Sequence, residues 1–187
     1  SGALSHPSNS KKIHYIGLLS RLQPTTTLQY IYDLLILLSG PEPQRTMFEN
    51  ILLSQIKTTN RKIVLVRGTL QPLTSKIVAP NLEVIDLADT QLLQQLIHQS
   101  YAVISRSGYT TLMDLIRCEK KALFVPTPGQ TEQEYLAKRM AEQYIFPFLE
   151  QRLFDFEQAM TTIDTFPFSI PYNREDYSLS EKRMASV

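Results

Sequence analysis

Short apolar runs alternate with stretches of helical pattern along most of the chain, and this alternation limits the possible folds more than any other feature. Five runs have the length of a strand, at residues 32–40, 62–68, 81–89, 102–108 and 122–129. Continuous apolar runs of this length are typical of strands buried on both faces. Amphipathic stretches that suit helices lie between or after them, at residues 41–60, 90–100, 109–120, 131–143 and 154–166.

Strands that alternate with helices predict βαβ units and a parallel sheet. We therefore expect an α/β fold, a Rossmann-like three-layer α/β/α domain with a mainly parallel sheet of about six strands. The sixth strand is expected at residues 144–150. A chain of 187 residues has room for one such domain. We place it at residues 12–166, between a flexible leader at 1–11 and a loose C-terminal tail at 167–187.

Composition and charge exclude several classes of function. A net charge of +1, with 20% charged residues, gives no general attraction to nucleic acid. The longest apolar stretches, such as residues 34–38, are far shorter than the roughly 20 residues that span a bilayer. Cys118 is the single cysteine, so a reducing compartment is expected and we predict a cytoplasmic location. No metal-ligand spacing and no G-x-G-x-x-G motif occurs, so neither a metal nor a cofactor is predicted.

Two turns follow neighbouring predicted strands, at residues 105–108 and 126–130. In parallel sheets ligands bind outside the carboxyl ends of the strands, so these turns are expected to face one crevice. The start of the helix after Gly108 would offer free N–H groups and a positive dipole end, which favour phosphate. The structural alternative, that Ser107 and Gly108 merely end a strand and begin a helix, stays open at this point.

Residues 101–140 carry a longer pattern than these turns alone. This stretch resembles the donor-binding C-terminal domain of GT-B glycosyltransferases, in particular the glycosyltransferase family 28 C-terminal domain of the lipid II-forming N-acetylglucosaminyltransferase group. The order of strands and helices extends the resemblance from about residue 13 to residue 145. The residues that match are Arg106, Ser107, Gly108, Thr111, Asp114, Pro126 and Gln133.

The resemblance implies roles in binding the nucleotide. The Gly108 turn and the start of the following helix would meet the diphosphate, and Arg106, Ser107 and Thr111 are placed in the same nucleotide-sugar site. Asp114 matches an acidic residue that accepts hydrogen bonds from the ribose hydroxyls, a role that suits a carboxylate because it offers only acceptors. Arg21 matches an arginine near the donor phosphates, where a guanidinium would neutralise a leaving diphosphate. A solvated helix aspartate and an exposed loop arginine are the structural alternatives.

The resemblance also implies contacts to the sugar and the base. Gln133 matches a glutamine that contacts the donor sugar hydroxyls, which suits an amide because it both donates and accepts. We place Gln130 and Glu134 in the same nucleotide-sugar site. Ile85 falls where the family reads uracil with backbone groups. The alternatives are surface side chains at a helix start and, for Ile85, a core strand.

Two departures from the family pattern affect the donor. The turn at residues 39–45 replaces a Gly-Gly-Ser turn, and its two prolines lack N–H groups, so it is a poorer anion cradle. Glu42 in that turn would repel a phosphate. Glu134 stands where the family has a second glutamine, which changes the sugars that fit.

The function implied is that of the donor-binding half of a glycosyltransferase, which binds a UDP-sugar or related nucleotide-sugar and is inactive alone. GT-B enzymes have two such domains, and the missing N-terminal domain would bind the acceptor, supply the base and make any membrane contact. The chain is then a fragment or a separate subunit. A surface near Arg21, residues 39–45 and residues 129–133 would face that domain. A nucleotide-sugar hydrolase or epimerase on the same fold, and a non-catalytic interaction module, are the alternatives; a base inside this domain would be sought first at Asp86, Glu132 and Glu134.

Overall fold

The computed structural model describes residues 19–25, 29–71 and 80–171. The predicted leader at residues 1–11 lies outside the described residues, as do residues 172–187 of the predicted tail. Residues 167–171 are described and do not lie apart from the domain. Phe168 and Ile170 pack against one of its two apolar clusters, and the Ser169 N–H donates to the Tyr144 carbonyl at 2.6 Å. The packed part of the chain therefore continues past residue 166.

The described strands form one five-stranded sheet in the order β3-β2-β1-β4-β5. Its strands are β1 (Tyr32–Leu37), β2 (Ile63–Val66), β3 (Leu82–Ile85), β4 (Ser100–Ser105) and β5 (Lys121–Phe124). Every pair of neighbours is parallel, with Leu35 opposite Val64 on one side and Val103 on the other. The predicted α/β class with a parallel sheet is confirmed.

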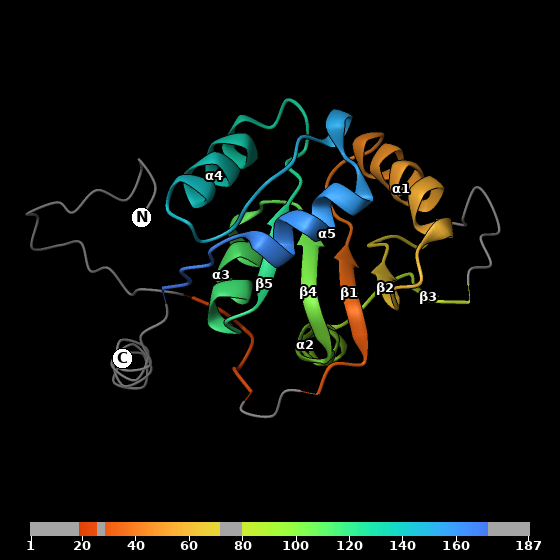
Figure 1. The fold of residues 1–187 in the computed structure, drawn as a ribbon, viewed down its shortest axis with the longest axis horizontal. Coiled ribbons are helices and arrows are strands. Elements are labelled where there is room, and N and C mark those ends of the chain that lie inside the picture. The colour runs from red at the N-terminus through yellow and green to blue at the C-terminus, as the bar shows by residue number, and fades with distance from the viewer. Residues whose placement is uncertain (1–18, 26–28, 72–79, 172–187) are drawn as a thin grey trace, which may run out of the picture.

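Five α-helices and two short 3-10 helices connect or follow these strands in the described part of the chain. The α-helices are α1 (Gln44–Gln55), α2 (Thr90–Gln99), α3 (Tyr109–Arg117), α4 (Thr131–Glu142) and α5 (Phe156–Thr165), and the 3-10 helices are η1 (Ile56–Thr58) and η2 (Gln151–Leu153). Residues 41–43, where the first helix was expected to start, form a turn instead. Figure 1 shows α5 crossing in front of the strands, with α1 beside it.

Alternate residues of the strands enter two separate apolar clusters, one on each face of the sheet. Leu34 and Ile36 of β1 pack with residues of α1 and α5, whereas Leu35 packs with residues of α2, α3 and α4. Side chains of a strand point to opposite faces in turn, so a strand covered on both faces needs apolar residues at every position. This is the physical reason for the continuous apolar runs in the sequence.

The expected sixth strand is reduced to a single bridge. Phe148 pairs with Phe124 at the edge of β5, through the bonds from the Phe124 N–H to the Pro147 carbonyl and from the Leu149 N–H to the Phe124 carbonyl. Pro147 has no N–H to add to the ladder, and the chain turns into η2 at Gln151. The sheet therefore ends at β5, with a short contact in place of a strand.

Strand order reverses between β1 and β4, which lie side by side although two strands separate them in the sequence. The carboxyl ends of the strands are at the top of the sheet in Figure 1, where α1 and α4 also lie. Ligands of open α/β sheets bind at such a reversal, outside the carboxyl ends. The loops after β1 and β4 are therefore the first place to look for a site, together with the loop after β5, the other neighbour of β4.

Candidate functional site

A pocket of about 390 Å³ lies between the beginnings of α3 and α4. These helices follow β4 and β5, so the pocket sits at the carboxyl ends of two adjacent strands. Its lining comes from both turns that the sequence singled out: Ser107, Gly108, Tyr109, Gly129, Gln130, Thr131, Glu132, Gln133 and Leu136. The prediction that these two turns face one crevice is thus met by the geometry.

Neither helix that begins at this pocket has a side-chain cap. Gly108 and Gln130 are the N-cap residues of α3 and α4. Gly108 has no side chain, and the Gln130 side chain accepts no bond from the N–H groups of its helix. In contrast, α2 and α5 begin at Asp89 and Asp155, whose carboxylates accept the Leu92 and Gln158 N–H groups. Uncapped N-termini leave backbone donors and positive dipole ends open to a ligand. The pocket is therefore suited to an anion in a way that the starts of α2 and α5 are not.

The two helix starts differ in charge. The first turn of α3 contains no acidic residue, whereas that of α4 contains Glu132 and Glu134. Glu132 lines the pocket, so an anion would be repelled at the α4 side and accepted at the α3 side. The α4 side instead offers carboxylate and amide groups that suit hydroxyl groups.

Glu134, which the sequence placed in the site, faces another direction. Its carboxylate accepts the Gly129 N–H at 2.9 Å, and its side chain lines a second pocket of about 490 Å³ on the far side of the 126–130 turn. Glu132 lines the first pocket instead, and the sequence analysis did not place it in the nucleotide-sugar site. Tyr109, which is 41% exposed at the first position of α3, was missed as well. An aromatic residue directly after the Gly108 turn was the available signal.

Gln133 and Gln130 tie the two turns together. The Gln133 side-chain oxygen accepts the Thr127 N–H at 3.0 Å, and its amide nitrogen donates to the Gln130 side-chain oxygen at 2.5 Å. The Ser107 hydroxyl donates to the Gln133 backbone carbonyl at 2.8 Å. Three of the predicted site residues are thus joined in one set of bonds, which fixes the distance between the α3 and α4 starts.

Arg106 does not reach this pocket. Its side chain is buried, with 2% of the residue exposed, and it donates to the Val125, Pro126 and Gln44 carbonyls and to the Gln151 side chain. Its guanidinium also lies 4.7 Å from the centre of the Phe48 ring. Burial lowers the pKa of Arg106 to about 10. The side chain therefore joins the ends of β4 and β5 to α1 and η2, and we correct its predicted contact with a ligand to a structural role.

Ile85 ends β3, at the opposite edge of the sheet from β5. Its side chain is partly buried against the cluster that packs under α2 and α3, and its carbonyl accepts the Arg67 N–H at 2.8 Å. The structure does not bring Ile85 into the lining of the pocket, although both lie along the carboxyl edge.

Asp114 is buried on α3, with 3% of the residue exposed, and is covered by the segment 19–23. The Ser20 hydroxyl donates to one carboxylate oxygen at 2.6 Å, and the Arg21 Nε lies 3.6 Å from the other. Arg21 also donates to the Thr90 hydroxyl at 3.4 Å. The structure therefore brings together Arg21 and Asp114, which lie far apart in the sequence. Thr111, also on α3, is half-buried and is not part of the pocket lining.

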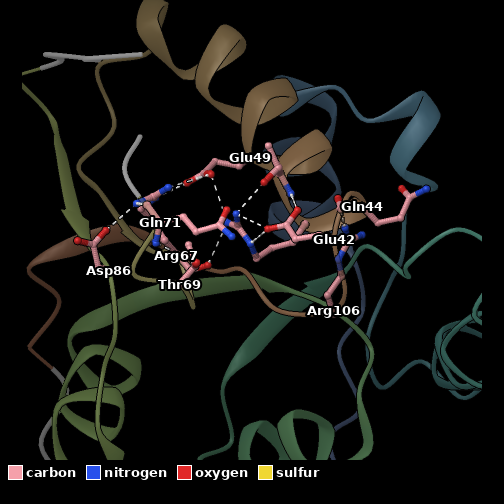
Figure 2. A network of polar contacts seen from close by, with 10 residues as sticks. Glu42, Gln44, Glu49, Arg67, Thr69, Gln71, Asp86 and Arg106 are labelled. Carbon is pink, nitrogen blue, oxygen red and sulfur yellow. Dashed lines mark hydrogen bonds and ion pairs between the residues drawn. The ribbon is translucent and has the colours of Figure 1, made fainter. Parts of the chain in front are cut away.

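A network of charged and polar side chains lies at the other half of the carboxyl edge, as Figure 2 shows. Glu49 of α1 accepts from Arg67, which follows β2, and from Arg45, and all three residues are at most 4% exposed. Arg67 donates also to Asp86 at 2.7 Å, and Arg45 to Glu42 at 2.7 Å. The Glu49 carboxylate holds the pKa of Arg67 above its usual range.

The turn at residues 39–45 presents this network instead of an anion cradle. The Glu42 carboxylate accepts the Thr46 N–H at 3.2 Å and so caps the start of α1 with a negative charge. Hydrogen bonding to the Thr46 side chain is the leading reason why the pKa of Glu42 is lowered, and the Arg45 side chain and this capping bond lower it further. A phosphate would find here a carboxylate in the place of free N–H groups.

Within the described ranges, no group of three or more His, Cys, Asp and Glu residues could hold a metal ion. His98 is half-buried at the end of α2, and its Nε2 lies 2.9 Å from the Gln23 carbonyl oxygen. Among the described helices, none is both long and apolar enough to cross a bilayer.

Comparisons with known proteins bear on this site. Residues 37–174 match the family described as glycosyltransferase family 28 C-terminal domain. Among solved structures, the chain is similar to MurG of Acinetobacter baumannii, with 18% identity and a TM-score of 0.51 over 82% of this chain and 47% of that one. It is similar to CalG4, the calicheamicin glycosyltransferase, with 15% identity and a TM-score of 0.60 over 88% of this chain and 42% of that one. It is also similar to the glycosyltransferase VinC in complex with dTDP, with 13% identity and a TM-score of 0.54 over 98% of this chain and 45% of that one. A search of curated proteins found no match. At these identities the structures establish the fold, and this chain spans less than half the length of each.

Proposed function

The chain belongs to the glycosyltransferase family 28 C-terminal domains, and from this premise we propose that it is the donor-binding half of a glycosyltransferase that takes a UDP-type nucleotide-sugar. The observation that carries the proposal is the meeting of two uncapped helix starts, those of α3 and α4, at one pocket. A nucleotide-sugar joins a charged diphosphate to a neutral sugar rich in hydroxyl groups. The two sides of this pocket differ in the same way.

The diphosphate is assigned to the α3 side. Gly108 has no side chain to fill the space beside the first N–H groups of α3, and a Cβ atom added there would meet no atom within 4 Å. The dipole end of α3 favours negative charge, and no carboxylate lies in its first turn. Phosphate oxygens can therefore approach the backbone closely at this turn.

The sugar is assigned to the α4 side. Glu132 accepts from hydroxyl groups, and the amides of Gln130 and Gln133 can accept and donate. Because Glu132 would repel a phosphate, charge places the diphosphate end of the ligand at α3 and the sugar end at α4. The identity of the hexose depends on how many of its hydroxyl groups these side chains can reach.

The rest of the nucleotide extends from α3 along the carboxyl edge toward β3. Asp114 is assigned to the ribose hydroxyls and the backbone at Ile85 to the base, as the family resemblance implies. Arg21 is assigned to the phosphates, because its side chain is 52% exposed and lies between the start of α2 and Asp114 of α3. These three assignments are supported by position on one edge of the sheet and by the family.

The acceptor and the catalytic base are assigned to a second domain. The chain spans less than half of the solved glycosyltransferases that it resembles in fold. Leu70 and Leu87, in the loops after β2 and β3, are 77% and 52% exposed at the same edge as the pocket. Exposed apolar side chains at the same end of the strands as a polar pocket, on the β2 and β3 side of the sheet, suit a surface that another domain covers. Closure of that domain would exclude water and place the acceptor.

A change of Gly108 tests the proposal. Gly108→Asp would give α3 the same carboxylate cap that α2 and α5 have, and the φ of −72° and ψ of 146° at this residue suit a capping side chain. We expect an unchanged or slightly higher melting temperature and an affinity for UDP lower by about tenfold or more, because the cap consumes the donors and adds a negative charge.

The measurement is a titration of the isotope-labelled chain with UDP, followed by the backbone amide signals of residues 107–111. Gly108→Asn is the matched control, since it caps the helix without the charge and so should lose less affinity. Equal UDP affinity in the Gly108→Asp variant and the wild type would place the phosphates elsewhere.

A further inference from the structure

A short segment upstream of the sheet lies across α2 and α3, and its downstream half is firmly held. We call residues 19–23 the strap. Leu22 is fully buried, and Gln23 is bonded through its N–H to Gln94, through its carbonyl to His98 and through its side chain to Arg117. The strap thus has a fixed position at residues 22–23, next to the carboxylate of Asp114.

The two oxygens of that carboxylate have different partners. The Ser20 hydroxyl donates to Asp114 Oδ1, with 2.6 Å between the two oxygens, which is the length of a strong hydrogen bond to a carboxylate. The Arg21 Nε is 3.6 Å from Oδ2, which is an ion pair without a hydrogen bond. The Arg21 contact with Thr90, at 3.4 Å, is also long, and its side chain is 52% exposed. One partner is therefore held tightly and the other loosely.

From this difference we infer that nucleotide binding exchanges one partner of Asp114 and keeps the other. The ribose hydroxyls replace the Arg21 guanidinium at Oδ2, while Ser20 stays on Oδ1 and holds the carboxylate in the orientation that the ribose needs. The released guanidinium then pairs with the diphosphate at the start of α3. Ser20 is a positioning residue in this exchange. The inference rests on the proposed function and deepens it.

The exchange follows from the environment of the carboxylate. With 4% of its side chain exposed, Asp114 has little contact with water, so a partner that leaves must be replaced by another donor. The ribose supplies such donors, and a guanidinium near a diphosphate makes charge-assisted bonds of its own. A nucleoside without phosphate can displace Arg21 but gives it no new partner. The exchange therefore favours nucleoside diphosphates over nucleosides.

The test compares two ligands, uridine and UDP, in titrations of the labelled chain followed at the amide signals around Asp114. For Arg21→Ala we expect an affinity for UDP lower by about tenfold or more, because the phosphates lose a cation. We expect uridine to bind as tightly as to the wild type or more tightly, since no guanidinium competes with the ribose for Oδ2. Loss of a merely structural contact would weaken both ligands together.

Two further variants complete the design. Arg61→Ala removes an arginine of similar exposure that pairs with Asp164, away from the site, and should leave both affinities unchanged. Ser20→Ala should weaken uridine and UDP by the same factor, because it releases the carboxylate from its orientation, and Ser20→Thr should restore both.

The outcomes separate the inference from the proposed function. An Arg21→Ala variant that loses uridine and UDP affinity equally, while the wild type binds UDP, overturns the exchange and leaves the donor site in place. A Ser20→Ala variant with wild-type affinity for both ligands overturns the positioning role. Absence of UDP binding by the wild-type chain, in titrations that reach millimolar ligand, overturns the proposed function and the exchange with it.

Discussion

Removal of Glu49 should be among the most destabilising single changes in this fold. Its carboxylate is 3% exposed and accepts from Arg67 at 2.5 and 3.3 Å and from Arg45 at 3.2 Å. In Glu49→Leu the two guanidinium groups, both almost fully buried, lose the anion between them. Arg67 then keeps Asp86, and Arg45 keeps Glu42, but these carboxylates are 54% and 42% exposed and lie at the ends of the network.

The magnitude follows from the cost of an uncompensated buried charge. Breaking a buried ion pair by removing one partner costs roughly 3–5 kcal/mol, a large part of the 5–15 kcal/mol by which domains are stable. For a chain of this size that loss corresponds to a melting temperature lower by about 10 °C. The free energy of unfolding would be measured by urea denaturation, with Glu142→Ala, an exposed change on α4, expected within about 0.5 kcal/mol of the wild type.

A second variant decides the cause. If the loss comes from the unpaired guanidinium, then Glu49→Leu together with Arg67→Met should be more stable than Glu49→Leu alone, because apolar groups of similar size replace the pair. A double variant less stable than the single one, or a single variant that loses under about 1 kcal/mol, would refute the reasoning.

Three further predictions concern other parts of the chain. Burial lowers the pKa of Lys120 to about 8, so as the pH rises the folded protein releases the Lys120 proton before the unfolded protein does. The free energy of unfolding should therefore rise by roughly 3 kcal/mol between about pH 8 and 10.5. Denaturation at pH 7.5 and 9.5 would measure this rise in the wild type, and no such rise is expected in Lys120→Met. Gly68→Ala should lower stability by about 1–3 kcal/mol, since φ is +70° and the added Cβ would lie 2.6 Å from the Leu38 carbonyl oxygen. Asp114→Ala should weaken UDP binding by roughly 1–3 kcal/mol in calorimetric titration, because the ribose donors lose their acceptor.

The fold was predictable because its strands are buried on both faces. A sequence that must place Leu34 and Leu35 in two different clusters cannot show the alternation of a surface strand, and the resulting continuous run is easy to recognise. The segment 144–150 was expected to form a strand but makes only one bridge, and the residue responsible, Pro147, is visible in the sequence. Pro147 can accept a bond but cannot donate one, so pairing cannot extend back from Phe148 along β5.

The position of the candidate pocket was predictable, but the directions of the side chains around it were not. Parallel strands bring the turns after β4 and β5 to one edge, which fixes Gly108 and Gln130 near each other. Which side chain of a helix start faces the pocket depends on the rotation of about 100° per residue and on the angle of entry. Glu132 and Glu134 are two positions apart and face different pockets, and no sequence pattern decides between them.

The contact between Ser20 and Asp114 was beyond reach for another reason. The two residues are 94 positions apart, and Ser20 belongs to no helix or strand whose pattern would place it. The burial of Arg106 was equally hidden, because an arginine between two small polar residues reads as exposed. Its two terminal guanidinium nitrogens make four hydrogen bonds to groups on three other segments, and none of those partners is local in sequence.

The distribution of charge along the carboxyl edge explains why Arg21 is the cation to assign to the phosphates. Three arginines at this edge, Arg45, Arg67 and Arg106, are at most 4% exposed and already donate to carboxylates or carbonyls. Drawing any of them toward a ligand would break bonds that are buried, at a cost of several kcal/mol for an ion pair. Arg21 is half exposed, its two contacts are long, and it lies beside α3, whose start is uncapped. Moving Arg21 toward a ligand therefore costs little free energy. It lies on the α3 side of the carboxyl edge, away from the network in which Glu49 already neutralises Arg45 and Arg67.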